Sequence, residues 1–195
     1  MLPEILSGDI ILSTNNSLLA KGIKFFEKAQ TGKAEFSHAA AGIGDAMIIE
    51  ALWQTRISPA SKYENQTIEI WRLPLTITDR MRFCIGMMQI AGNAYGLTKI
   101  PLFALDGIAT QVSKLWGNKN PVFFFTSKFG ILSIPVCSQL VVYGLHKFTK
   151  YRLRDGDHNE VPWRVVSPDY LQDILEHPHN DAKPIYKQKA EQHGK

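Results

Sequence analysis

Only two cysteines, Cys84 and Cys137, occur in this chain of 195 residues. Neither belongs to a CxxC pair or to a Cys/His spacing that would bind a metal. Two isolated cysteines cannot build a disulfide framework, so we expect both thiols to be reduced. We expect neither a metal nor a cofactor.

The chain also lacks a long hydrophobic run. Its most apolar stretch, Ile131 to Leu145, contains Pro135 and is shorter than the roughly 18 to 20 residues that a membrane helix needs. The first residues show neither the basic nor the apolar region of a secretory signal. These absences predict a cytoplasmic protein without a transmembrane segment, unless a phage particle or a secretion system delivers it outside the cell.

Charge of one sign is not concentrated anywhere in the sequence. The net charge is +4, and the one local basic cluster, between Lys147 and Arg154, is followed at once by Asp155 and Asp157. No nucleic-acid-binding motif accompanies it, so we expect no specific nucleic-acid partner. The net positive charge is compatible with an anionic wall polymer or lipid surface.

The 45% hydrophobic content is sufficient for one well-buried core. We therefore predict a single α+β domain over residues 1–176. The remaining residues, 177–195, are polar and show no apolar periodicity, which predicts a tail that is either free or docked on a larger assembly.

Hydrophobic spacing predicts the elements of this domain. Predicted strands are 9–13, 36–43, 46–52 and 68–73, and predicted helices are 18–29, 78–92, 137–148 and 168–175. Cys84 lies in the apolar stripe of the second helix, formed with Met81, Met87 and Met88, and is predicted to be a buried structural thiol. We expect the segment 95–120 to be a helical insertion. The apolar residues of this region could line a groove for an acyl chain, although core packing is the better explanation for them: Phe103, Leu105, Trp116 and Phe123 to Phe125.

Three residues together could supply the chemistry of a thiol hydrolase, although Cys137 or His38 taken alone is also typical of a buried structural group. Cys137 begins a predicted helix, where the helix dipole and free backbone N–H groups favour a thiolate. His38, at the start of a predicted strand, can exchange a proton with that thiol, and Glu50 can orient the imidazole. A carboxylate within the apolar run Met47 to Leu52 needs a cationic or N–H partner, and His38 on the neighbouring strand would meet that need.

The hairpin between the two strands decides whether His38 and Glu50 can meet. A two-residue turn at Gly44-Asp45 would pair His38 with Ala51 and send Glu50 to the opposite face. One additional residue, in a three-residue loop or a bulge, would place Glu50 opposite His38 or on its diagonal. Gly42 makes such a bulge feasible.

Four blocks carry a resemblance to a known family: Gly8 to Leu12, Phe36 to Ile43, Ile48 to Ala51 and Val136 to Val141. They resemble the permuted branch of the NlpC/P60 papain-like superfamily, which includes YiiX-like and lecithin:retinol acyltransferase-like proteins. There the histidine strand precedes the cysteine helix, and the third group follows the histidine by about a dozen residues. The chain departs from the usual pattern at Gln139, where an acidic residue is common, and in the small residues after His38.

This resemblance implies a circularly permuted papain-like fold, an antiparallel sheet packed on the cysteine helix. It also implies a Cys137–His38–Glu50 triad with an oxyanion site at the backbone N–H groups of Cys137 and Ser138. The function expected first is a cysteine hydrolase that cleaves an amide bond, such as one in a peptidoglycan peptide, or an ester. The alternatives are a lipid acyl hydrolase or acyltransferase of the same fold, and a phage or secretion-machine component that keeps the module for binding.

Overall fold

A six-stranded antiparallel sheet organises the part of the chain that the structure describes. The structure is a computed structural model. It describes residues 2–14, 35–51, 54–92 and 137–190, with isolated positions at 24, 28, 109 and 112. The predicted helix over 18–29 and the predicted segments between 95 and 136, including the residues of the acyl groove, lie outside the described ranges.

The strands follow the order β4-β3-β2-β1-β5-β6 across the sheet, and all neighbours are antiparallel. Their bounds are β1 Ile10–Thr14, β2 His38–Gly44, β3 Met47–Ala51, β4 Thr55–Pro59, β5 Thr67–Arg72 and β6 Lys183–Gln188. Three α-helices are described, α2 Ile77–Gln89, α5 Cys137–Phe148 and α6 Pro168–Glu176, together with the short 3-10 helices η1 Ala60–Tyr63, η2 Trp163–Val165 and η3 Pro178–Asn180.

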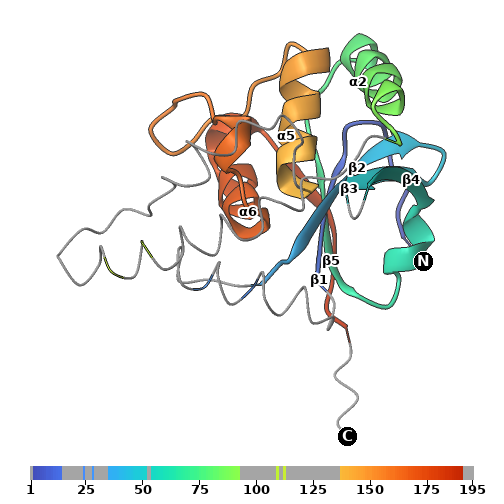
Figure 1. The fold of residues 1–195 in the computed structure, drawn as a ribbon, viewed down its shortest axis with the longest axis horizontal. Helices are drawn as coiled ribbons and strands as arrows, with labels where there is room; N and C mark the ends of the chain where they lie inside the picture. Colours follow the sequence, from blue (N-terminus) through green and yellow to red (C-terminus); the bar gives the residue numbers. More distant parts are fainter. Residues whose placement is uncertain are drawn as a thin grey trace, which may run out of the picture.

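The helices α2, α5 and α6 gather on one face of the sheet (Figure 1). Alternation along β2 divides its side chains between two cores. Ala39 and Ala41 face the helices, where Leu140 and Val141 of α5 are buried with them. Ala40 faces the other side and packs with Tyr63 of η1. Both faces of the sheet are therefore covered.

Glycines allow α2 and α5 to approach each other closely. A Cβ atom on Gly86 of α2 would lie 2.2 Å from the ring of Phe148, and one on Gly144 of α5 would lie 2.3 Å from the sulfur of Met87. Phe83 and Met87 are consequently the buried residues of α2, whereas Met81 and Met88 are more than half exposed. Apolar residues line two sides of this helix, so spacing alone could not identify the side that meets α5.

Part of the predicted tail forms a strand. Lys183–Gln188 pairs with β5 as the edge strand β6, so the expectation of a free or partner-docked tail from residue 177 is wrong for this segment. Lys187 of this strand pairs with the largely buried Glu69 at 2.8 Å. An edge strand with one exposed side can be polar, which is why hydrophobic periodicity did not reveal it.

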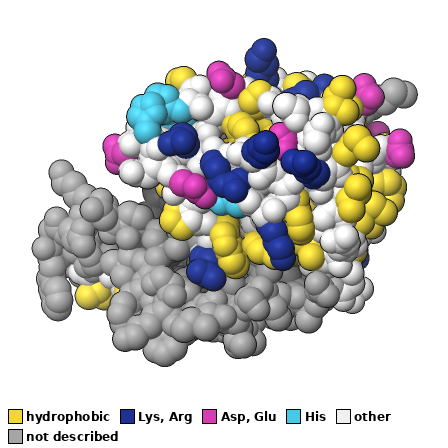
Figure 2. Space-filling view, turned by 90° about the horizontal axis from the view of Figure 1, so that it is seen from above, with side chains coloured by type: hydrophobic (Ala, Val, Ile, Leu, Met, Phe, Trp, Pro, Cys, Tyr) yellow, Lys and Arg dark blue, Asp and Glu magenta, His cyan; other side chains and the backbone are white. Residues whose placement is uncertain are grey.

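Within the described ranges, no helix is both long enough and apolar enough to cross a membrane. On the face seen in Figure 2, lysine and arginine side chains stand among acidic, apolar and histidine side chains.

Candidate active site

The hairpin β2-β3 places His38 and Glu50 on the same face of the sheet. Asp45 and Ala46 form a two-residue turn in which both have positive φ, 51° and 55°. A regular ladder from this turn would put the two side chains on opposite faces. A bulge between Gly42 and Gly44 shifts the register by one residue, and Ala40 then pairs with Glu50. Glu50 lies on the diagonal from His38, as the bulge alternative predicted.

His38 and Glu50 are hydrogen-bonded, with 3.0 Å between Nε2 of the ring and Oε2 of the carboxylate. The thiol of Cys137 is the other side-chain hydrogen-bond partner of His38. Because Nε2 is engaged by Glu50, Nδ1 is the nitrogen left for the sulfur. The structure thus brings together the three side chains that the sequence singled out.

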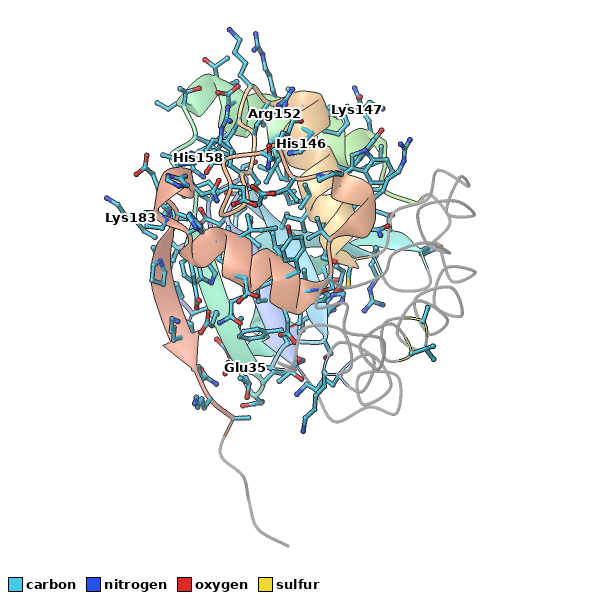
Figure 3. All side chains as sticks on the ribbon, turned by 90° about the vertical axis from the view of Figure 1, so that its left-hand side faces the viewer. Glu35, His146, Lys147, Arg152, His158 and Lys183 are labelled. Atoms are coloured by element: carbon cyan, nitrogen blue, oxygen red, sulfur yellow. The ribbon has the colours of Figure 1, made fainter. Side chains whose placement is uncertain are left out.

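Three hydrogen bonds from backbone N–H groups fix the segment that leads into His38. Oδ1 of Asp169, in the first turn of α6, accepts hydrogen bonds from the backbone N–H groups of Glu35 at 3.1 Å and Phe36 at 2.8 Å. The N–H of Ser37 donates to the carbonyl of Ser13 in β1 at 3.1 Å. The strand therefore begins at a defined place, and Glu35 lies beside the sheet in Figure 3.

The first turn of α5 is anchored to the chain before α6. The hydroxyl of Ser138 donates to the carbonyl of Val166 at 2.7 Å, and the side-chain amide of Gln139 donates to the carbonyl of Arg164 at 2.6 Å. Both side chains are buried. Gln139 thus has a structural contact here. The opposite end of α5, with His146 and Lys147, lies away from the site (Figure 3).

Electrostatics favour a charged thiol–imidazole pair. Burial lowers the pKa of His38, but hydrogen bonds and charges from Cys137 and Glu50 outweigh it and raise that pKa to about 9. Burial alone would raise the pKa of Cys137. The pKa of Cys137 nevertheless lies below its ordinary value, because His38 contributes a hydrogen bond and a positive charge and the backbone N–H groups of Ala39 and Ser138 bind the sulfur.

The exposures of the two cysteines differ from the expectation. Cys137 is buried, with 4% of its surface exposed, whereas Cys84 is half-buried. Cys137 interacts with His38 at the start of β2. The sulfur of Cys84 donates to the carbonyl of Ile43 at 3.2 Å, at the margin of the buried side of α2. The prediction of a buried Cys84 is therefore wrong, although His38 contacts the predicted thiol.

Glu50 has four further partners that the sequence analysis missed. Its side chain is fully buried, and it accepts hydrogen bonds from β4 and η1 as well as from His38. Tyr63 donates to Oε2 at 2.7 Å, Ser58 to Oε1 at 2.9 Å and Arg56 Nε to Oε1 at 3.1 Å, and Lys62 also binds Oε1. The need of a buried carboxylate for cations was the available signal, and Arg56 and Lys62 stand 6 and 12 residues after Glu50.

These partners keep the carboxylate ionised. Burial raises the pKa of Glu50, but hydrogen bonds from His38, Lys62 and Tyr63 and the charge of His38 outweigh it, so the pKa lies well below its usual range. The pKa of Tyr63 is raised by burial and by the charge of Glu50, so its hydroxyl remains a donor.

Comparison with known proteins supports the fold. No family model matches the chain, and no curated protein matches it by sequence. A solved structure described as metalloprotein yiiX from Escherichia coli O157:H7 is similar, with a TM-score of 0.60 and 14% sequence identity. The match covers 96% of this chain and 99% of that one. The α+β fold is thus YiiX-like, while the permuted papain-like relation stays a prediction.

The described residues around His38 and Glu50 do not form a site that fits a metal ion. Glu50, the only carboxylate bonded to His38 among the described residues, already accepts from Arg56 and Lys62, whose charges would repel a cation. Within residues 2–14, 35–51, 54–92 and 137–190, no three His, Cys, Asp or Glu side chains are grouped to hold a metal ion. We therefore assign no step to a metal.

Proposed function

We propose that this chain is a cysteine hydrolase that acts on acyl substrates through Cys137, His38 and Glu50. The observation that carries the proposal is the continuous line of contacts from the thiol through the imidazole to an ionised carboxylate. A pre-formed thiolate–imidazolium pair is the arrangement that cysteine hydrolases need before substrate arrives.

In the first half of the reaction, the thiolate of Cys137 attacks the carbonyl carbon of the substrate and forms a C–S bond. Backbone N–H groups at the start of α5, those of Cys137 and Ser138, stabilise the oxyanion that develops. The imidazolium of His38 donates its proton to the leaving amine or alcohol as the C–N or C–O bond breaks. This leaves a thioester on Cys137 and a neutral imidazole.

In the second half, His38 removes a proton from a water molecule that attacks the thioester. The C–S bond breaks, the acid is released, and the thiolate–imidazolium pair is restored. Glu50 stays ionised throughout and fixes the ring through Nε2, so Nδ1 keeps facing the sulfur. An amide and an ester fit this scheme equally, and so does transfer of the acyl group to another acceptor.

Labelling of the two cysteines tests the proposal before the substrate is known. Iodoacetamide should modify Cys137 rapidly near pH 6, well below the roughly 8.5 at which a free thiol ionises. His38→Ala should move the Cys137 profile up towards the free value, because the cationic partner is lost. Peptide mass spectrometry reads both sites, and Cys84 serves as the internal control.

An acyl electrophile then separates an enzyme from a binding module. A thioester-forming probe, such as an activated acyl ester, should acylate Cys137, and the adduct should turn over in the wild type. A Cys137 that alkylates only above about pH 8, unchanged by His38→Ala, would mean that the thiol is not activated. The phage or secretion-machine binding role would then replace the hydrolase.

A further inference from the structure

The carboxylate of Glu50 is held on all sides by fixed donors. Oε2 accepts hydrogen bonds from His38 and from the hydroxyl of Tyr63. Oε1 accepts from Ser58, Arg56 and Lys62. The groups come from three elements, β2, β4 and η1, that all pack around β3. A triad would need only the first contact, so the others require an explanation.

The donors that η1 supplies to Glu50 are one buried hydroxyl and one cation that is more buried than Arg56. Tyr63 is 2% exposed and lies with its ring centroid 6.3 Å from that of His38. The Lys62 side chain is 27% exposed, whereas Arg56 on the same oxygen is 48% exposed. Water can replace an exposed cation more readily than a buried one, so Lys62 stabilises the carboxylate charge more strongly than Arg56 does.

The placement of Tyr63 also fixes the direction of the carboxylate. Its hydroxyl binds the same oxygen, Oε2, that accepts from His38. With Lys62 on Oε1, one donor from η1 holds each oxygen, and rotation of the carboxylate would break both contacts. The β2-β3 hairpin and η1 thus together fix the orientation of the His38 imidazole.

We propose that Lys62 and Tyr63 are positioning residues, which hold Glu50 ionised and aimed at His38 so that the Cys137–His38 pair persists in mild acid. This inference rests on the proposed function. In this proposal, η1 sets the pH range over which the Cys137–His38 pair stays charged. It does so through Glu50, without contacting substrate. The charged groups facing Glu50 are His38, Arg56 and Lys62, with Cys137 beyond His38.

The test is the acid side of the pH profile for iodoacetamide alkylation of Cys137 in the full chain. Lys62→Met removes the cation, so Glu50 binds a proton at higher pH and ceases to stabilise the imidazolium. Alkylation near pH 5.5 should fall about tenfold relative to the wild type, while the rate near pH 8 changes little. Lys62→Arg should restore most of the rate. Tyr63→Phe should give a similar but smaller loss.

Lys187→Met is the matched control, because Lys187 also pairs with a largely buried carboxylate, Glu69, on the same sheet but away from Cys137. It should leave the profile unchanged. Thermal unfolding establishes that each variant is folded, and Tyr63→Phe decides the matter if Lys62→Met does not fold. Profiles that match the wild type in both folded variants would overturn the role of η1. An unactivated Cys137 in the wild type would instead overturn the hydrolase proposal itself.

Discussion

Glu50 is the residue on which the described site depends most. Its buried charge is compensated by contacts with a histidine, two cations and two hydroxyl groups. Removing one member of a buried ion pair leaves the others desolvated without a partner, which costs more than the pair contributes to stability. Stability and orientation of His38 are therefore coupled at this one side chain.

Substitutions of Glu50 should separate these two effects. Glu50→Leu leaves Lys62, Tyr63 and Ser58 facing an apolar group, and we expect the free energy of unfolding to fall by about 3–5 kcal/mol. Glu50→Gln keeps two polar atoms and should lose less stability, while Cys137 alkylation near pH 6 still slows. Urea denaturation measures the first quantity. Equal stability of the wild type and Glu50→Leu would mean that the buried cluster is not formed.

The sequence was informative about residues whose chemistry is unusual for their surroundings. Glu50 in an apolar strand required a partner, and the argument from hairpin register identified His38 as one that a bulge would allow. Arg56 and Lys62 were missed because charged residues in a polar segment are ordinary. Their role emerges only when β4 and η1 fold back on β3, which is a tertiary contact that local spacing does not encode.

At the scale of elements, the strands with buried faces and the cysteine helix agree closely with their predicted ranges. The predicted 137–148 helix is α5, and the predicted 168–175 helix extends by one residue in α6. β4 and β6 were not predicted. Both are edge strands, each paired on one side only, and their sequences mix charged residues and proline with apolar ones. Edge strands need little hydrophobic surface, so periodicity gives them a weak signal.

The contact between α2 and α5 should tolerate no additional atoms at Gly86. Gly86→Ala would bring a methyl group to 2.2 Å from the Phe148 ring, and the helices would have to separate. We expect a loss of about 1–3 kcal/mol in the free energy of unfolding, measured by urea denaturation. Ile85→Ala, at a neighbouring position that is 57% exposed, is the control and should change stability by only about 0.5 kcal/mol. Similar values for both would show that the two helices are not in close contact.

At the scale of the whole molecule, the proposed active site lies where the two layers join. His38 and Glu50 belong to the face of the sheet that packs on η1, and Cys137 belongs to the helix layer on the other face. His38 can contact both Glu50 and Cys137 because it is the first residue of β2, beside the start of α5. Assembly of the thiolate–imidazolium pair therefore reports on correct packing of both layers.

This coupling predicts how stability depends on pH. The folded pKa of His38 is raised to about 9 from 6.5, so its contribution is full below pH 6.5 and is lost as pH rises through about 9. The folded pKa of Cys137 is lowered from 9.0, so its contribution is full above pH 9 and is lost as pH falls through the folded value. The two act together only while both groups are charged, which gives a maximum on the neutral to mildly alkaline side.

The difference in melting temperature between the wild type and Cys137→Ala isolates this contribution from every other titrating group. We expect the difference to be largest between about pH 6.5 and 9 and to shrink on both sides. At acid pH the thiolate is protonated in the fold, and at alkaline pH the imidazolium loses its proton. His38→Ala should also give a difference that shrinks at alkaline pH, but its difference at acid pH should stay larger than that of Cys137→Ala, because it removes the contact with Glu50 as well. A difference that stays constant from pH 5 to pH 10 would mean that Cys137 contributes by packing alone and that no ion pair forms in the folded protein.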